Sequence, residues 1–223
     1  MAFNQEEFNN FVLENNVIGL FSEQKKLKSG RYSSWYVNWR TVAGDAFLLD
    51  QLSDYVLEFT RDQGLQPDNF YGVPEGATKL GIITQFKWAQ SSPDYAPHSH
   101  AMPMGRGKPK EHGAAKDRFY VGEPRGNTIV LEDVTTTGGS LLETIDTLTV
   151  PVIAAFGLTN RMEKTDQGYS VKEAVESRGI PYHSMSNAFD LLPAMYKKVQ
   201  PGEEIRESIE KEFIEYGVEP LNL

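Results

Sequence analysis

The sequence predicts an α/β fold, in which helices flank a parallel sheet and a smaller N-terminal segment packs against it. From about residue 69 onward, short apolar runs alternate with helical patterns, as they do in βαβ units. Two of these runs, 128–133 and 150–160, are apolar on both faces, which is typical of strands inside a parallel sheet. The first 40 residues do not follow the alternation. We therefore predict an N-terminal hood at 1–40 and an α/β core at 41–223.

The N-terminal elements have local signals of their own. Asn4, followed by Glu7 and by apolar residues at 8 and 11–13, indicates a capped amphipathic helix. Residues 33–40 have the aromatic and β-branched content of a strand. The spacing of the apolar residues over 46–62 predicts a second helix.

The core elements follow from the same patterns. A short strand at 69–73 precedes a helix at 76–90. The strand at 128–133 leads into a helix at 139–148, where the spacing of Ser140 and Glu143 predicts a capping box. After the strand at 150–160, we expect a helix, a short strand and two further helices, at 171–178, 181–185, 188–199 and 202–215.

Composition excludes several classes of function. The chain of 223 residues has a net charge of −9, which argues against general binding of nucleic acid. It has no cysteine, so disulfides, thiolate metal ligands and cysteine nucleophiles are excluded. No apolar run approaches about 18 residues, so we expect no membrane span. These features fit a cytoplasmic protein.

The stretch IVLEDVTTTGGSLLETI, 129–145, is the main candidate site. Glu132 and Asp133 lie where a strand ends, and ligands of open α/β sheets bind beyond the carboxyl ends of the strands. The next residues lead into a helix N-terminus, whose backbone N–H groups and dipole attract anions. Glycines that admit a close ligand and hydroxyl donors make up this turn: Thr135, Thr136, Thr137, Gly138, Gly139 and Ser140. The turn therefore predicts a phosphate site.

The two carboxylates indicate what else the ligand contains. They would repel a phosphate, so we expect them to face a part of the ligand that is rich in hydroxyls. A ribose 5-phosphate has both parts, and carboxylates can also help to bind a divalent metal. The alternative is that an acidic pair merely ends a strand before a Gly-Gly turn. The pattern of a Walker A loop is absent.

The order of strand, two acids, Thr-Thr-Thr-Gly-Gly-Ser and helix resembles the phosphoribosyl-diphosphate motif of the type I phosphoribosyltransferases. The resemblance implies the fold of that family, with the acids and the polar loop gripping the ribose and its 5-phosphate. By itself, this motif is shared by purine and pyrimidine enzymes.

The segment KLKSGRYSSWYVNWR, 26–40, reads on physical grounds as a basic turn followed by an aromatic strand. Alone, it would be a solvated turn beside core aromatics. It resembles the N-terminal segment of orotate phosphoribosyltransferases, which forms a hood over the base. The resemblance implies that Lys28 contacts the substrate and that Tyr36 lies near the pyrimidine ring.

The segment MGRGKPKEHGAAKDRF, 104–119, is rich in Gly and charge and is expected to be a loop. It is either a solvated surface loop or a lid that brings cations to a diphosphate leaving group. It resembles the catalytic loop of orotate phosphoribosyltransferases, R-K-x-x-K-x-H-G. Gly107 replaces the second basic residue, and Lys108 is the candidate substitute. The matching residues are Arg106, Lys110, His112 and Gly113.

Two further positions bear on the resemblance. Glu75 stands where many family members have a diphosphate-binding lysine, so we assign it no such contact. Arg161 follows a strand end, where family members use an arginine to bind the carboxylate of orotate, and a guanidinium fork suits that group.

The resemblance implies an enzyme that converts orotate and phosphoribosyl diphosphate, with Mg²⁺, into orotidine 5-monophosphate and diphosphate. The substrate diphosphate would hold most of the Mg²⁺, with Asp133 as a possible protein ligand. Lys110, Arg106 and His112 would neutralise the leaving group, and either Lys110 or His112 can supply it with a proton. Asp133 would also stabilise positive charge on the ribose ring. The family implies a homodimer in which the loop 104–113 covers the neighbouring active site.

Two alternatives share the 129–140 motif. A purine phosphoribosyltransferase would give no reason for the segments 26–40 and 104–113. A non-catalytic regulator of pyrimidine genes, binding nucleotide or RNA, is disfavoured by the acidic chain and by the loop cations.

Overall fold

The parallel sheet predicted from the sequence is present. The structure is a computed structural model that describes residues 2–27, 29–108, 110–112 and 118–223. In these ranges, four parallel strands pair in the order β3–β6–β7–β8. Their carboxyl ends meet at one side of the sheet, which we call the C-terminal edge. The strands are β3 (Asn69–Gly72), β6 (Thr128–Thr135), β7 (Val152–Asn160) and β8 (Tyr182–Asn187).

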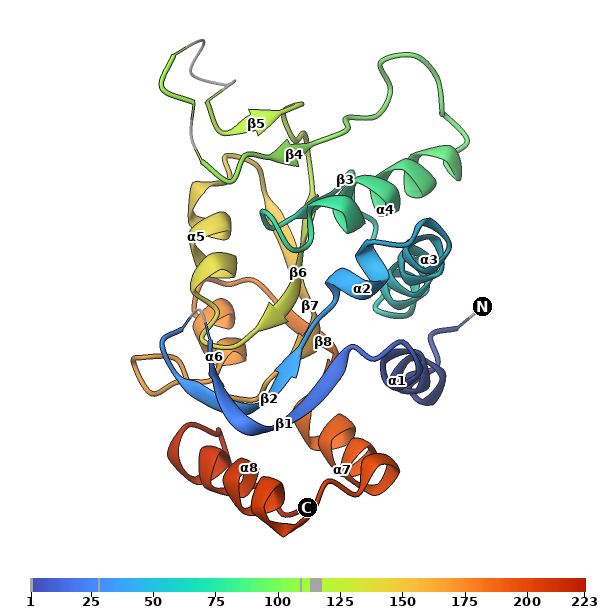
Figure 1. Ribbon diagram of the computed structural model, residues 1–223. Helices are drawn as coiled ribbons and strands as arrows, with labels where there is room; N and C mark the ends of the chain where they lie inside the picture. The colour runs from blue at the N-terminus through green and yellow to red at the C-terminus, as the bar shows by residue number, and fades with distance from the viewer. Residues whose placement is uncertain (1, 28, 109, 113–117) are drawn as a thin grey trace.

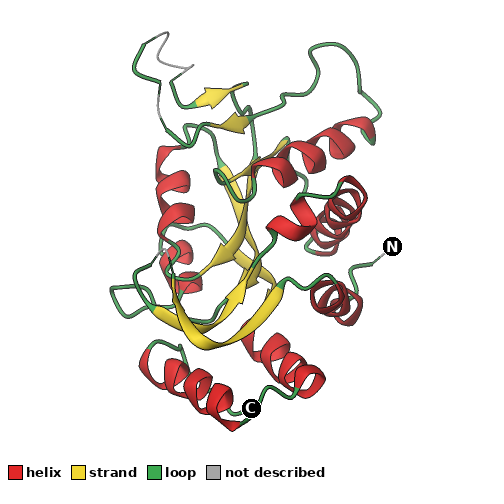
Figure 2. Ribbon diagram, in the orientation of Figure 1, coloured by secondary structure: helices red, strands yellow, loops and turns green. Residues whose placement is uncertain are grey.

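Helices cover both faces of this sheet, as expected (Figure 1, Figure 2). Along β6, Ile129 and Leu131 pack into one apolar cluster and Val130 packs into another on the opposite face. The first cluster is completed by α1 (Gln5–Glu14), α3 (Ala46–Asp62), α4 (Thr78–Gln90) and α7 (Ala188–Val199), and the second by α5 (Gly139–Thr147) and α6 (Val171–Glu176).

The N-terminal segment forms an antiparallel hairpin of β1 (Ile18–Lys26) and β2 (Tyr32–Val37). The strand predicted at 33–40 ends earlier, and the short helix α2 (Arg40–Ala43) begins where Asn38 Oδ1 accepts a hydrogen bond from the Arg40 backbone N–H at 3.2 Å. β1 was not predicted, because its outer half is polar and exposed. The capped first helix is confirmed, since Asn4 accepts from the backbone of Glu6 and Glu7.

The hairpin lies between the sheet and the last helix, α8 (Glu203–Glu215) (Figure 1). Trp35 of β2 stacks with Phe213 of α8, their ring centroids 6.3 Å apart. On the sheet side, Trp39 Nε1 donates to Thr159 Oγ1 at 3.1 Å. Residues before and after position 40 therefore share one apolar cluster. The division at residue 40 stays a prediction.

The described ends of the segment 104–119 lie at the other end of the molecule (Figure 1). Its base is the pair of short antiparallel strands β4 (Met104–Gly105) and β5 (Tyr120–Val121). Backbone bonds from Arg106 to Phe119 and from Lys110 to Arg118, both 2.9 Å, continue the pairing outward. Figure 1 shows β4 and β5 at the end of the molecule opposite α8.

The predicted capping box at Ser140 is wrong. Helix α5 begins at Gly139, and its N-cap, Gly138, gives no side-chain hydrogen bond. A capping box occurs instead at α6, where Ser170 and Glu173 bond reciprocally. None of the helices in the described ranges combines the length and the apolar character that crossing a bilayer requires.

Candidate active site

The two acids at the end of β6 differ in what surrounds them. Glu132 is buried, 6% exposed, on the face that also carries Val130. Asp133 is half-buried, and its Oδ1 accepts a hydrogen bond from the Val134 N–H at 2.9 Å. The loop after β3 runs against this carboxylate, because a Cβ atom at Gly76 would lie 2.3 Å from Asp133 Oδ2. Asp133 is therefore the less buried acid of the pair, and it lies beside the loop after β3 at the C-terminal edge.

The turn after β6 leads directly into the N-terminus of α5. Gly138 adopts a left-handed conformation, with φ of 76°, which turns the chain into the helix. Gly139, the first helical residue, is exposed, and a Cβ atom there would meet nothing within 4 Å. The first backbone N–H groups of a helix have no partner within it. The backbone at 139–141 thus presents donors and the positive end of a helix dipole, as an anion site requires.

Not every hydroxyl of the turn serves this site. Thr135 is buried, and its Oγ1 lies 2.7 Å from Tyr182 Oη. Burial raises the pKa of Tyr182, so its hydroxyl stays protonated at neutral pH. We expected Thr135 to offer a donor to phosphate, but the structure commits its hydroxyl to Tyr182. Thr136 and Thr137 remain half-buried, and Thr137 lines a cavity of about 620 Å³ together with Gly139.

The base of the 104–119 segment packs on the loop after β3. A Cβ atom at Gly105 would lie 2.2 Å from Tyr71 Oη. A Cβ atom at Gly107 would lie 2.7 Å from Glu75 Oε1. The two departures from the family pattern, Glu75 and Gly107, therefore meet in space.

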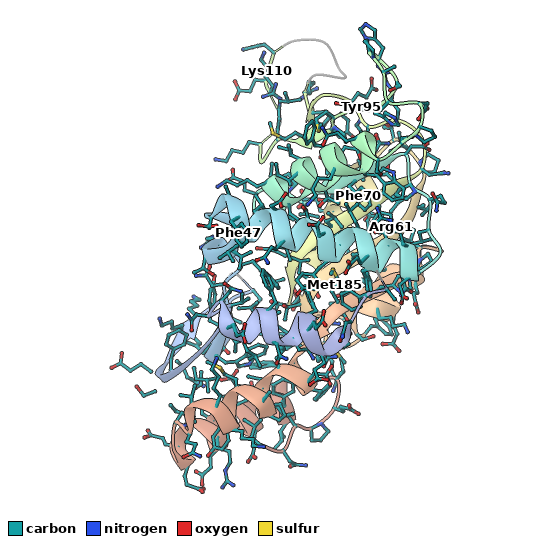
Figure 3. All side chains as sticks on the ribbon, turned by 90° about the vertical axis from the view of Figure 1, so that its right-hand side faces the viewer. Phe47, Arg61, Phe70, Tyr95, Lys110 and Met185 are labelled. Atoms are coloured by element: carbon teal, nitrogen blue, oxygen red, sulfur yellow. The ribbon has the colours of Figure 1, made fainter. Side chains whose placement is uncertain are left out.

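The basic side chains of this segment lie at or near the surface. Lys108, Lys110 and His112 are exposed, and Arg106 is half-buried. Figure 3 shows Lys110 at the end of the molecule beyond Phe70 of β3, with Met185 of β8 lying toward the other end. Gly113, the last matching residue of the loop, lies outside the described residues.

Arg161 is not open to a ligand in this structure. It is 1% exposed, and its Nε donates to Glu163 Oε1 at 2.7 Å. Its other nitrogens donate to Ser33 Oγ at 2.9 Å and to the carbonyl of Trp35 at 3.3 Å. Burial lowers the pKa of Arg161. In this structure Glu163, Ser33 and the carbonyl of Trp35 each accept from one nitrogen of the guanidinium, and the predicted contact of Arg161 with the carboxylate of orotate stays a prediction.

The hood residues are described in part. Tyr36 lies in β2, is half-buried and pairs in register with Gly19 of β1. Lys28 lies outside the described residues, and its predicted contact stays a prediction. Sequence reasoning missed Glu212, which is buried in α8 and bonds to β2. Its spacing from Ile209 and Phe213 on the buried face of the helix was the available signal.

The described residues fit a metal that a substrate would largely hold. No group of three His, Asp or Glu side chains in these ranges could hold a metal ion. The half-buried carboxylate of Asp133 suits Mg²⁺, which binds through one or two carboxylates together with substrate phosphates.

Comparison with known proteins decides the family. No family model matches the sequence. An orotate phosphoribosyltransferase of a Bradyrhizobium species is 30% identical over 177 residues, which cover 74% of this chain and 86% of that protein. This chain belongs to the orotate phosphoribosyltransferase family. Another member, from Methylococcus capsulatus, is 28% identical over 188 residues, 81% of this chain and 83% of its own.

Solved structures agree on the type I phosphoribosyltransferase fold. Orotate phosphoribosyltransferase from Francisella tularensis matches with a TM-score of 0.66 and 19% identity, over 95% of this chain and 99% of its own. The enzyme from Mycobacterium tuberculosis in complex with 5-phospho-alpha-D-ribosyl 1-diphosphate matches with a TM-score of 0.54 and 19% identity, over 84% of this chain and 98% of its own. The fold predicted from the sequence is thus confirmed.

Proposed function

We propose that this chain transfers the 5-phosphoribosyl group from phosphoribosyl diphosphate to orotate, giving orotidine 5-monophosphate and diphosphate. The observation that carries the proposal is the end of β6, where Asp133 precedes a glycine turn into the N-terminus of α5, in a chain of this family. The reaction would supply the nucleotide of de novo pyrimidine synthesis.

In this proposal the turn after β6 binds the phosphate of the ribose 5-phosphate, and Asp133 binds its ribose. The N–H groups of 139–141, with the hydroxyls of Thr136 and Thr137, hold the phosphate. Asp133 faces the ribose hydroxyls, which donate to its carboxylate, and stabilises the positive charge of an oxocarbenium-like transition state. A ring nitrogen of orotate forms a bond to the anomeric carbon as the bond to the diphosphate oxygen breaks. The charge of orotate is on its carboxylate, so the attacking ring nitrogen gives up its N–H proton to solvent as the new bond forms.

The leaving diphosphate is the second centre of charge. Asp133 is the residue that would help to hold Mg²⁺, which would supply positive charge there when bound. Arg106, Lys110 and His112 stabilise the same developing charge. Either Lys110 or His112 can donate a proton to the departing oxygen. Lys108 supplies the positive charge of the basic family residue that Gly107 replaces.

The absorbance of orotate tests this function directly. With phosphoribosyl diphosphate and Mg²⁺, we expect orotate to be consumed, while adenine, hypoxanthine and uracil are left unchanged. Consumption of a purine would instead support a purine phosphoribosyltransferase. If no base is consumed while nucleotide or RNA binds, the regulator is favoured. The cytoplasmic location stays a prediction.

We further propose a homodimer in which the loop 104–113 serves the neighbouring site. The support is that β4 and β5 lead this segment away from the hood of their own chain (Figure 1). A two-fold dimer lets each chain lend its loop to the other.

Complementation between two defective chains follows from such a dimer. Lys110→Ala removes a loop cation, Asp133→Asn removes the ribose acid, and each homodimer is expected to be nearly inactive. A mixed dimer contains one site with both defects and one with neither. Random mixing makes about half of the dimers mixed, so about one quarter of wild-type activity should return. The two chains would be co-expressed with different tags, and a pull-down would confirm exchange. Exchange without recovered activity would mean that the loop acts within its own chain.

A further inference from the structure

A buried polar network joins the C-terminal helix to the hood, and its member in that helix, Glu212, has no role in the function proposed above. Glu212 of α8 is 7% exposed. Its Oε1 accepts a hydrogen bond from the backbone N–H of Ser34 at 2.5 Å, and its Oε2 lies 2.7 Å from Ser33 Oγ. Both serines belong to β2, the strand that also carries Tyr36. One carboxylate therefore holds this strand from the side away from the sheet.

The network continues to the end of β7. Ser33 Oγ, which contacts Glu212, also accepts from Arg161 Nη2 at 2.9 Å. Arg161 binds Glu163, whose second oxygen accepts from Arg31 Nη1 at 2.8 Å, at the turn between β1 and β2. Two anions and two cations thus tie the hairpin to the C-terminal edge and to α8 at once.

Such a network is a costly way to stabilise a fold. Burial raises the pKa of Glu212, which reflects the cost of holding this carboxylate away from water. Apolar residues of similar volume often replace buried charges without loss of stability, whereas buried polar groups can fix one geometry among several. The geometry fixed here is that of β2 over the C-terminal edge, where ligands of α/β sheets bind.

We propose that Glu212 is a positioning residue for the base end of the active site. By holding Ser33 and Ser34, it sets where β2 and its Tyr36 lie above the end of β7, and so sets the room left for the pyrimidine ring. The inference rests on the proposed function, because it concerns the affinity for orotate. Phosphoribosyl diphosphate binds at β6 and α5, which the network does not include.

Glu212→Gln tests the inference. Glutamine keeps the shape and one acceptor but puts an amide donor in place of the other oxygen. We expect KM for orotate to rise about tenfold, the usual effect of losing one charged hydrogen bond. We expect KM for phosphoribosyl diphosphate and kcat to stay within about twofold, since their groups are untouched. The matched control is Glu207→Gln, which removes the same charge from an exposed position of the same helix.

A second variant keeps the test decisive if Glu212→Gln fails to fold. Ser33→Ala removes the hydroxyl between Glu212 and Arg161 but leaves the bond to the Ser34 backbone, and it should raise KM for orotate in the same selective way. An unchanged KM for orotate in a folded variant, or an equal rise for both substrates, would overturn the inference. Wild-type turnover of orotate tests the proposed function separately, because only the ratio of variant to wild type concerns Glu212.

Discussion

Gly139→Asp is expected to abolish binding of phosphoribosyl diphosphate while the protein stays folded. A Cβ atom at position 139 meets no neighbour within 4 Å, so the start of the new side chain has room. An acidic residue in the first turn of a helix also suits the helix dipole, so α5 should lose no stability. The same carboxylate stands where a phosphate would approach the N–H groups of 139–141. Its charge would repel the ligand, and its oxygens would compete for the donors.

Titration calorimetry with phosphoribosyl diphosphate and Mg²⁺ measures this effect. Gly139→Ala is the matched control, because it adds a side chain at the same position without charge, and its affinity should stay within a few-fold of wild type. Thermal unfolding would confirm that both variants are folded. Unchanged affinity in folded Gly139→Asp would remove the N-terminus of α5 from the phosphate site.

Lys110→Ala is expected to lower kcat about a hundredfold while orotate affinity changes little. The lysine is proposed to act on charge that develops only as the diphosphate leaves, so its loss should raise the barrier rather than weaken the ground state. One preorganised donor of this kind contributes about 3 kcal/mol. The backbone bond from Lys110 to Arg118, at 2.9 Å, does not depend on the side chain, so the hairpin should persist.

Steady-state kinetics with both substrates varied separates kcat from the two KM values. Lys211→Ala, which removes an exposed lysine from α8, controls for the change in net charge. Turnover within a few-fold of wild type would make Lys110 an ordinary surface lysine and would leave the diphosphate to Mg²⁺ and the remaining cations.

Most of the fold could be predicted because its signals are local. The periodicity of the apolar residues gave α3 (Ala46–Asp62), and the two-faced apolar runs gave β6 and β7 nearly to their bounds. The N-cap at Asn4 is set by residues only two and three positions away. β1 was not predicted, because a strand that exposes its outer half has no apolar pattern to detect there.

The site could be predicted only in part, because the hydrogen-bond partners of its side chains come from distant segments of the chain. The sequence indicated the turn and the acid, but it gave no sign that Tyr182, 47 positions away, takes the hydroxyl of Thr135. Arg161 matched a ligand-binding arginine by position, yet Ser33 lies 128 positions from it and Glu163 only two. A pattern shows which groups are present, whereas burial decides which of them are already occupied.

The contact between Glu75 and Gly107 bears on how the site attracts its anionic substrate. Where the family pattern has two lysines, this chain has a carboxylate facing a residue without a side chain. The substrate must then be held more by backbone N–H groups and a helix dipole, and less by mobile charges. Dissolved ions screen exposed charges over about 10 Å at 0.1 M salt, but they act less on donors in direct contact with a ligand. The affinity of this chain for phosphoribosyl diphosphate should therefore fall less steeply with ionic strength than that of a relative with both lysines.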